Sequence, residues 1–325
     1  MGLPVTVYRW DDEGAPQITT GSVSQCLDVL QKCLVDGYGN KSSLGWTLEY
    51  SDDDIFAKVF KNSPVEGNGI YAKFWSKDQL DGSERIVRMQ TCKSMTDIDT
   101  MIMPGIYHAF KTLRNNSVTK WVIIGTSRGF YLFLMPQEVS WVNHYQIQNS
   151  CAFIGEIQGS IAGDTALYCV VSESNNSSND SYAWQDNLSA LNINMTLNIG
   201  KMYASNGDTG ALNYRLETYF DVPSNAQGFE GELPASANFS EVVVRAQFTV
   251  TSTQYLDSEG TPYSRSDIQP FIKGTMPGLI QSSTPAFEKS PWPCIKNIGN
   301  DDYFVVGNPY GTGGSSLFIN LREWS

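Results

Sequence analysis

The sequence is poor in the residues on which many catalytic and metal sites depend. Its 325 residues include only two histidines, His108 and His144, and six cysteines that are scattered without a C-x-x-C pair. This cysteine pattern provides neither a zinc-site spacing nor a disulfide framework. We therefore expect reduced, buried thiols in a chain that folds in a cytoplasm, and we expect no cofactor.

Positive charge is also scarce. The chain has 22 Lys and Arg against 34 Asp and Glu, for a formal net charge of −12, and its basic residues form no cluster. Because binding to a nucleic-acid backbone depends on concentrated positive charge, we expect no direct contact with nucleic acid. The longest apolar runs, such as FYLFLM, are strand-sized, and the first residues lack a basic region followed by an apolar stretch. We accordingly expect no membrane span and no secretory signal.

The composition favours a β-rich fold with one clear helix at about residues 22–36. Charged residues make up only 17% of the chain, so hydroxyl and amide side chains must cover much of the surface. In SVSQCLDVLQKCLVDGYG, apolar residues recur with the 3.6-residue period of a helix. Ser22 and Gln25 form a capping box, and Gly37 provides the left-handed stop.

The remaining patterns predict antiparallel sheets in two units. Up to residue 148, segments such as LGWTLEY, GIYAKFW and GFYLFLM alternate with polar turns, which indicates an α+β domain with an antiparallel meander and one helix. Residues 149–325 have almost no helical periodicity and predict an all-β domain. Its long polar loops, 172–187 and 221–240, are typical of contact segments.

The stretch GTSRG, residues 125–129, matches the G-x-S-x-G pattern of the nucleophile elbow in serine hydrolases. An elbow requires a helix after the serine, whereas FYLFLM predicts a strand. His144 follows in a segment with no acid beside it. We interpret Ser127 as part of a hairpin turn and predict no catalytic residue and no enzymatic activity. A serine esterase built on Ser127 is the remote alternative.

Two acidic clusters are candidates for metal sites. Asp52, Asp53 and Asp54 lie between two strand segments and indicate a solvated turn. Asp97 and Asp99 lie near threonine oxygens that are suitable for calcium, but a calcium loop needs further carboxylates and a glycine at fixed offsets. We expect structural turns at both places and no metal site.

Three tryptophans in polar surroundings are possible contact residues: Trp184 in a polar loop, Trp292 in SPWPC, and the penultimate Trp324. Loop aromatics can stack on sugars or anchor a partner, although they more often close the end of a β-core. If they are exposed, they favour an alternative function, a carbohydrate-binding or adhesion module with a surface glycan as partner.

Several strings, taken in order, resemble virion structural proteins of tailed bacteriophages and prophages. They are VYRWDDEGAPQ, LDVLQKCLVDGYGNKSSLGWTLEY, SMTDIDT, WVIIGTSRGFYLFL and FIGEIQGSIAGDTALYCVV. The resemblance covers about residues 4–172 and is thin beyond them. It implies a non-enzymatic virion component in the capsid, the collar or the tail and baseplate, and it transfers no catalytic or ligand residue.

The resemblance also implies partners and a location. The protein would fold in the bacterial host cytoplasm and then join the virion, where other virion proteins and copies of itself are its partners. Polar loops 172–187 and 221–240 and the C-terminal segment Leu321 to Ser325 are the expected contacts. Repeated weak contacts of this kind gain strength from multivalency.

Overall fold

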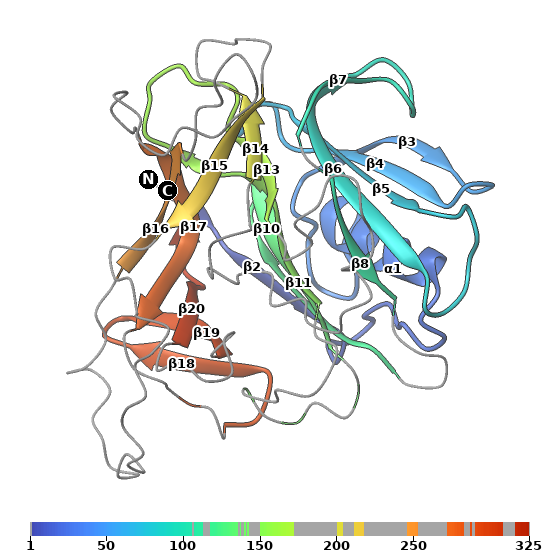
Figure 1. The fold of residues 1–325 in the computed structure, drawn as a ribbon. Coiled ribbons are helices and arrows are strands. Elements are labelled where there is room, and N and C mark those ends of the chain that lie inside the picture. The colour runs from blue at the N-terminus through green and yellow to red at the C-terminus, as the bar shows by residue number, and fades with distance from the viewer. Residues whose placement is uncertain are drawn as a thin grey trace, which may run out of the picture.

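The computed structural model describes residues 2–105, 107–112, 118–135, 137, 140, 142, 150–171, 200–203, 211–217, 246–252, 272–282, 287, 290–307 and 316–324. Over these ranges the protein is β-rich, with antiparallel sheets and a single helical segment (Figure 1). The fold class predicted from the sequence is confirmed.

The helical segment consists of α1 (Val23–Gln31) and a π-helical continuation, η1 (Lys32–Asp36). It begins where predicted, because the Ser22 side chain accepts a hydrogen bond from the Gln25 backbone N–H. It ends at Gly37, which has a φ of 79°. The apolar stripe of α1 is buried, so packing rather than propensity stabilises this short helix.

A six-stranded sheet lies beside the helix (Figure 1). Its path runs through β3 (Thr47–Asp52), β4 (Ala57–Lys61), β5 (Tyr71–Ser76), β6 (Ile86–Met95) and β7 (Met101–Pro104), with β8 (His108–Lys111) also paired to β6. Phe60, Phe74 and Met89 of this sheet share a core with the buried side of α1. The helix therefore covers one face of the sheet, as its amphipathic pattern requires.

A five-stranded sheet forms the middle layer (Figure 1). Its order is β13 (Tyr168–Val171), β11 (Ser150–Glu156), β10 (Gly129–Met135), β9 (Lys120–Gly125) and β2 (Thr6–Arg9). Pairing of β10 with β11 crosses the boundary expected near residue 148. Strands from both predicted units thus belong to one sheet.

A third sheet contains mainly C-terminal strands. Its order is β14 (Gly200–Tyr203), β15 (Ala211–Glu217), β16 (Ala246–Ser252), β17 (Ile272–Ser282), β20 (Ser316–Asn320), β19 (Asp301–Gly307) and β18 (Cys294–Ile298), and β12 (Gln158–Gly159) pairs with β17. Strand β1 (Leu3–Pro4) pairs with β21 (Glu323–Trp324), which places the two described ends of the chain side by side (Figure 1).

The middle sheet is buried on both faces. Along β10, Phe130 and Leu132 point into a first core shared with α1 and the six-stranded sheet. The intervening Tyr131 and Phe133 point into a second core shared with β17, β19 and β20. A strand buried on both faces reads as a continuous apolar run, which explains FYLFLM. The five cysteines whose side chains are described are free and buried, as expected: Cys26, Cys33, Cys92, Cys169 and Cys294.

Candidate functional site

The GTSRG stretch is the turn of a β-hairpin. Strands β9 and β10 pair antiparallel with Gly125 opposite Phe130, and the Thr126 N–H donates to the Gly129 carbonyl at 2.9 Å. Ser127 therefore leads directly into a strand, and the strand-to-helix geometry of a nucleophile elbow does not form. His108 lies buried in β8 of the neighbouring sheet, whereas His144 lies outside the described residues.

Close packing explains the glycines that flank this turn. A Cβ at Gly125 would lie 2.8 Å from Leu44 Cδ1 and 2.9 Å from the Gly129 carbonyl oxygen. A Cβ at Gly155 on the next strand would collide with Gly129 Cα. The sequence pattern that resembles a catalytic motif thus reflects close approach of three strands.

The buried carboxylate of Glu156 links the turn to loop 62–69. Glu156 accepts hydrogen bonds from Asn62 Nδ2 at 2.5 Å and from the backbone N–H and Nδ2 of Asn68 at 2.6 and 2.8 Å. The Arg128 guanidinium lies 3.5 Å from Glu156 Oε2, the oxygen that also accepts from Asn68 Nδ2, and the Glu156 side chain is fully buried. These donors compensate the cost of burying the charge. They fix loop 62–69 against the hairpin, where the Ser63 N–H also donates to the Ser127 carbonyl.

A small open cavity beside the hairpin is lined in part by Thr126, Arg128 and Gln158, with room for little more than a water molecule. The lining also contains Glu156, whose carboxylate accepts from Asn62 and Asn68, whereas the Thr126 hydroxyl accepts from the Arg128 backbone N–H at 3.2 Å. A second organised polar cluster of this half of the chain lies at the end of β2.

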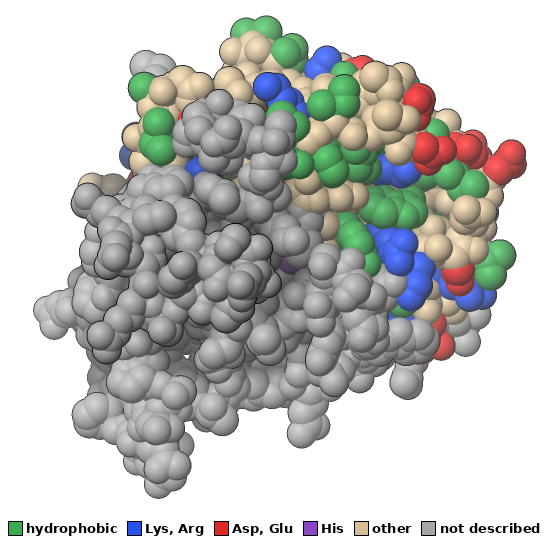
Figure 2. Space-filling view, turned by 45° about the horizontal axis from the view of Figure 1, so that its top comes forward, with side chains coloured by type: hydrophobic (Ala, Val, Ile, Leu, Met, Phe, Trp, Pro, Cys, Tyr) green, Lys and Arg blue, Asp and Glu red, His purple; other side chains and the backbone are tan. Residues whose placement is uncertain are grey.

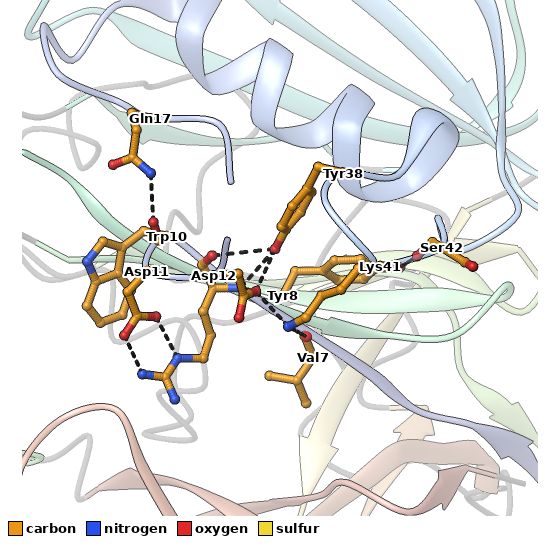
Figure 3. Close-up of polar contacts among 10 residues, drawn as sticks. Val7, Tyr8, Trp10, Asp11, Asp12, Gln17, Tyr38, Lys41 and Ser42 are labelled. Carbon is orange, nitrogen blue, oxygen red and sulfur yellow. Dashed lines mark hydrogen bonds and ion pairs between the residues drawn. The ribbon is translucent and has the colours of Figure 1, made fainter. Parts of the chain in front are cut away.

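That cluster, which we call the Asp12 network, is centred on one carboxylate oxygen (Figure 3). Asp12 Oδ2 accepts hydrogen bonds from Lys41 Nζ at 2.6 Å, from the Tyr38 hydroxyl at 2.7 Å and from the Arg9 backbone N–H at 2.7 Å. Lys41 Nζ also donates to the Val7 carbonyl at 2.7 Å. The network joins the end of β2 to the loop that follows η1.

Local sequence explains why these groups meet. Strand β2 ends just before the DDEGAP turn, and η1 ends at Gly37. The turn after β2 and the loop after η1 therefore lie next to each other. A Cβ at Gly39 would collide with the Glu13 carbonyl, and Gly39 has a φ of 54°. Only glycine allows this approach without strain. The hydroxyl of Tyr8 then donates to the Ser42 carbonyl at 2.6 Å.

The same loop reaches the GTSRG hairpin through Trp46. Its indole N–H donates to the Thr126 carbonyl at 3.4 Å, and its ring packs edge-on against Phe130 with centroids 5.6 Å apart. Three strings that are far apart in the sequence, those containing DDEGAP, GYGNKSSLGWT and GTSRG, are therefore in mutual contact. Their shared role in this structure is to lock the middle sheet to the helix and its loop.

The hydrogen bonds of the Asp12 network shift the pKa values of its acidic groups. Burial alone would raise the pKa of the Asp12 carboxyl, but hydrogen bonds from Lys41, Tyr38 and the Arg9 N–H outweigh burial and lower it. Burial, followed by the hydrogen bond to Asp12, raises the pKa of the Tyr38 hydroxyl. Asp12 is thus ionised and Tyr38 neutral at neutral pH, which suits a fixed structural link and not proton transfer.

Trp292 and Trp324 are buried, which agrees with the more common packing role of loop aromatics and not with exposure to a sugar. Trp292 is 5% exposed because its ring stacks on Trp10 with centroids 5.5 Å apart and an interplanar angle of 12°. Trp324 is 4% exposed and packs edge-on against Tyr131 at 5.4 Å. Both indoles close the second core, so their faces are not available to stack on a sugar. Trp184 and loops 172–187 and 221–240 lie outside the described residues.

The acidic clusters form turns. The Asp97 carboxylate accepts from the backbone N–H groups of Asp99 and Thr100 at 2.9 and 2.8 Å, and Asp52 accepts from the Asp54 N–H at 3.0 Å. Asp99 pairs with Lys73 at 3.2 Å. Across the described ranges, no group of three or more His, Cys, Asp or Glu side chains is placed to hold a metal ion.

Sequence reasoning did not identify Asp12, Lys41 or Glu156. The first two lie in strings that carry the resemblance, so the order of those strings was the available signal. Glu156 also lies in such a string, FIGEIQGSIAGDTALYCVV, but its partners Asn62 and Asn68 are 94 and 88 residues away in the chain, so no local pattern indicated their contact.

No protein-family model matches the chain, and a search of curated proteins returns no match. Among the residues that the structure describes, no helix is long and apolar enough to cross a membrane.

Proposed function

We propose that the chain is a non-enzymatic structural protein of the virion of a tailed bacteriophage or prophage, acting by multivalent contact with other virion proteins and copies of itself. The observation that carries the proposal is the convergence of the resembling strings on one framework. Three contacts join these strings and fix the shape of the framework. They are between Asp12 and Lys41, between Gly39 and Glu13, and between Trp46 and Thr126. Contacts that fix the shape of a subunit are what assembly requires.

The exposed surface supports the same proposal. The described part of the face drawn in Figure 2 carries hydrophobic, basic and acidic side chains in a mixed arrangement. Val65 is 91% exposed at the tip of loop 62–69. Two backbone N–H groups of this tip donate to the Ser63 hydroxyl, and Glu156 holds the base of the loop.

A rigid loop that presents an apolar tip is well suited to protein contact. Ordering a flexible loop costs free energy on binding, and this loop is already ordered by Ser63 and Glu156. Burying an exposed valine against a partner contributes about 1.5–3 kcal/mol per contact. Repetition over many copies multiplies the effect. We therefore assign loop 62–69 a contact role in the particle.

Immunogold labelling of purified particles tests the function. Antibodies against the purified chain are expected to label intact particles at repeated, symmetry-related positions, and peptide mass spectrometry of the same particles is expected to find the chain. Unlabelled particles without its peptides would overturn the proposal.

Complementation tests the contact surface. In a phage lacking the gene, Val65→Asp is expected to lower the number of copies per particle at least several-fold, because a charge would enter an apolar contact. Leu80→Asp is the matched control on another loop, where the wild-type residue is 50% exposed. Equal incorporation of the two variants into particles would show that Val65 is not part of a contact between subunits.

A further inference from the structure

An ion pair is completely enclosed in the C-terminal half of the fold. Lys273 on β17 and Asp164, in the segment between β12 and β13, lie with Nζ and Oδ2 2.7 Å apart. Both side chains are 0% exposed, and 109 residues separate them in the chain. A fully buried lysine and aspartate in direct contact form an unusual arrangement that the assembly function does not use.

The backbone on both sides of the pair is fixed. Strands β12 and β17 pair with Gly159 opposite Gly274, and the Ser160 N–H donates to the Lys273 carbonyl at 3.0 Å. A Cβ at Gly274 would collide with the Gln158 carbonyl, so the two segments approach as closely as backbones allow. Groups held in this way react as if at very high local concentration.

Two further contacts orient the reacting atoms. The Ala166 N–H donates to Asp164 Oδ1 at 2.8 Å, and Lys273 Nζ donates to the Tyr203 carbonyl at 2.7 Å. The first contact polarises the carboxyl group and would stabilise negative charge that develops on Oδ1 during attack at its carbon. The second aligns one N–H bond of the lysine away from the carboxyl group.

Burial favours the uncharged form of the Lys273 amine. Removal from water lowers the pKa of the Lys273 ammonium, although its hydrogen bond to Asp164 opposes this. Transfer of one proton from Nζ to Oδ2 gives a neutral amine, which is a nucleophile, beside a carboxylic acid. A neutral amide bond between the two side chains would also remove the desolvation penalty of a buried ion pair.

We propose that Lys273 and Asp164 condense to an intramolecular amide bond. The Nζ–Cγ bond forms and the Cγ–Oδ2 bond breaks. Oδ2 leaves as water with two of the three ammonium protons, and the third stays on the amide nitrogen, where it donates to the Tyr203 carbonyl. Ala166 holds Oδ1 throughout, and no oxidant, reductant or other reactant is required.

The cross-link would tie β17 covalently to the segment after β12. Closing so long a loop restricts the unfolded chain and stabilises the folded one. Such a bond suits a protein under mechanical load, but it does not depend on the proposed virion function, and its absence would leave that proposal intact.

Intact mass spectrometry of the full chain, unfolded under reducing conditions, tests the bond. The expected mass is lower than the sequence mass by one water, and a tryptic digest is expected to contain a branched peptide that joins the Lys273 and Asp164 segments. Lys273→Met should restore the unmodified mass, whereas Lys296→Met, at a lysine on β18 outside this pair, should retain the loss of water. The wild-type mass decides the question even if Lys273→Met fails to fold.

Three results would overturn the proposal. A wild-type mass equal to that of the sequence shows that no condensation occurs. Complete tryptic cleavage after Lys273 shows that its amine is free. Loss of water confined to a linear peptide places the dehydration at a single aspartate and not between the two side chains.

Discussion

Asp12 Oδ2 and Lys41 Nζ lie 2.6 Å apart, although 29 residues separate them in the chain. This ion pair joins the turn after β2 to the loop after η1, and the Tyr38 hydroxyl donates to the same oxygen (Figure 3). The middle sheet and the helical layer are therefore connected by a charged contact as well as by their apolar core. Substitutions in this network and in the hairpin that it supports should change the stability of the fold in distinguishable ways.

Asp12→Asn is expected to destabilise the fold by about 2 kcal/mol at neutral pH, because hydrogen bonds to a charged group are lost and Lys41 is left without its carboxylate. The Asp12 and Lys41 side chains are only 19% and 27% exposed, so water replaces the contact poorly. Urea unfolding followed by tryptophan fluorescence measures the change. Asp11→Asn, in the more exposed pair with Arg9, is the control and should cost less than about 1 kcal/mol.

The effect of Asp12→Asn should depend on pH in one direction. The pKa of Asp12 is lowered in the folded state, so its stabilisation is fully present above the ordinary value of 3.8. It is lost as the pH falls through the folded-state pKa. The difference between wild type and variant should therefore be constant near neutrality and shrink in acid below pH 3.8. A difference that grows on acidification would contradict the assignment.

Gly39→Ala is expected to destabilise the protein by about 2 kcal/mol or more, since the new methyl group meets the Glu13 carbonyl and the residue has a left-handed φ. Gly45→Ala separates the two causes. Gly45 has a φ of 79°, but a Cβ there would have nothing within 4 Å, so only the conformational cost of about 1 kcal/mol should appear. Equal midpoints in denaturant for the two variants would show that the Gly39–Glu13 approach is unimportant.

Ser127→Ala is expected to change stability by less than about 0.5 kcal/mol, because the turn uses the Ser127 carbonyl and not its hydroxyl. Gly125→Ala in the same turn should cost about 2 kcal/mol through overpacking against Leu44. A fluorophosphonate probe should label neither the wild-type chain nor the variants. Labelling of wild type that disappears in Ser127→Ala would restore the esterase alternative.

Glu156→Gln is expected to destabilise the hairpin by about 2 kcal/mol, because an amide N–H₂ would face the donor groups of Asn62 or Asn68 without an acceptor. Glu66→Gln in the same loop is the control, since Glu66 is exposed and its change should be close to neutral. Hydrogen exchange should show faster exchange of the Asn68 N–H in Glu156→Gln alone. Unchanged exchange in that variant would show that Glu156 does not brace the loop.

Local periodicity explains what could be predicted from sequence. The helix from Val23 onward follows from a 3.6-residue apolar stripe with a serine cap, and the hairpin at GTSRG follows from two apolar runs around a glycine-rich turn. The β-rich class follows from many short alternating segments. Each of these features is encoded within about 20 consecutive residues.

Contacts between distant segments explain what could not be predicted. Trp292 lies between prolines in a polar stretch, and its burial depends on Trp10 at the other end of the chain. Glu156 finds its partners in a loop more than 80 residues earlier. The middle sheet crosses residue 148 because β11 pairs with β10, and no local pattern specifies that partner.

Reconstruction of intact particles by cryo-electron microscopy tests the central proposal most directly. We predict repeated copies of a subunit whose density fits the three sheets and the helix of Figure 1, with loop 62–69 at a contact between subunits. A complete reconstruction in which every density is assigned to other chains would contradict the account.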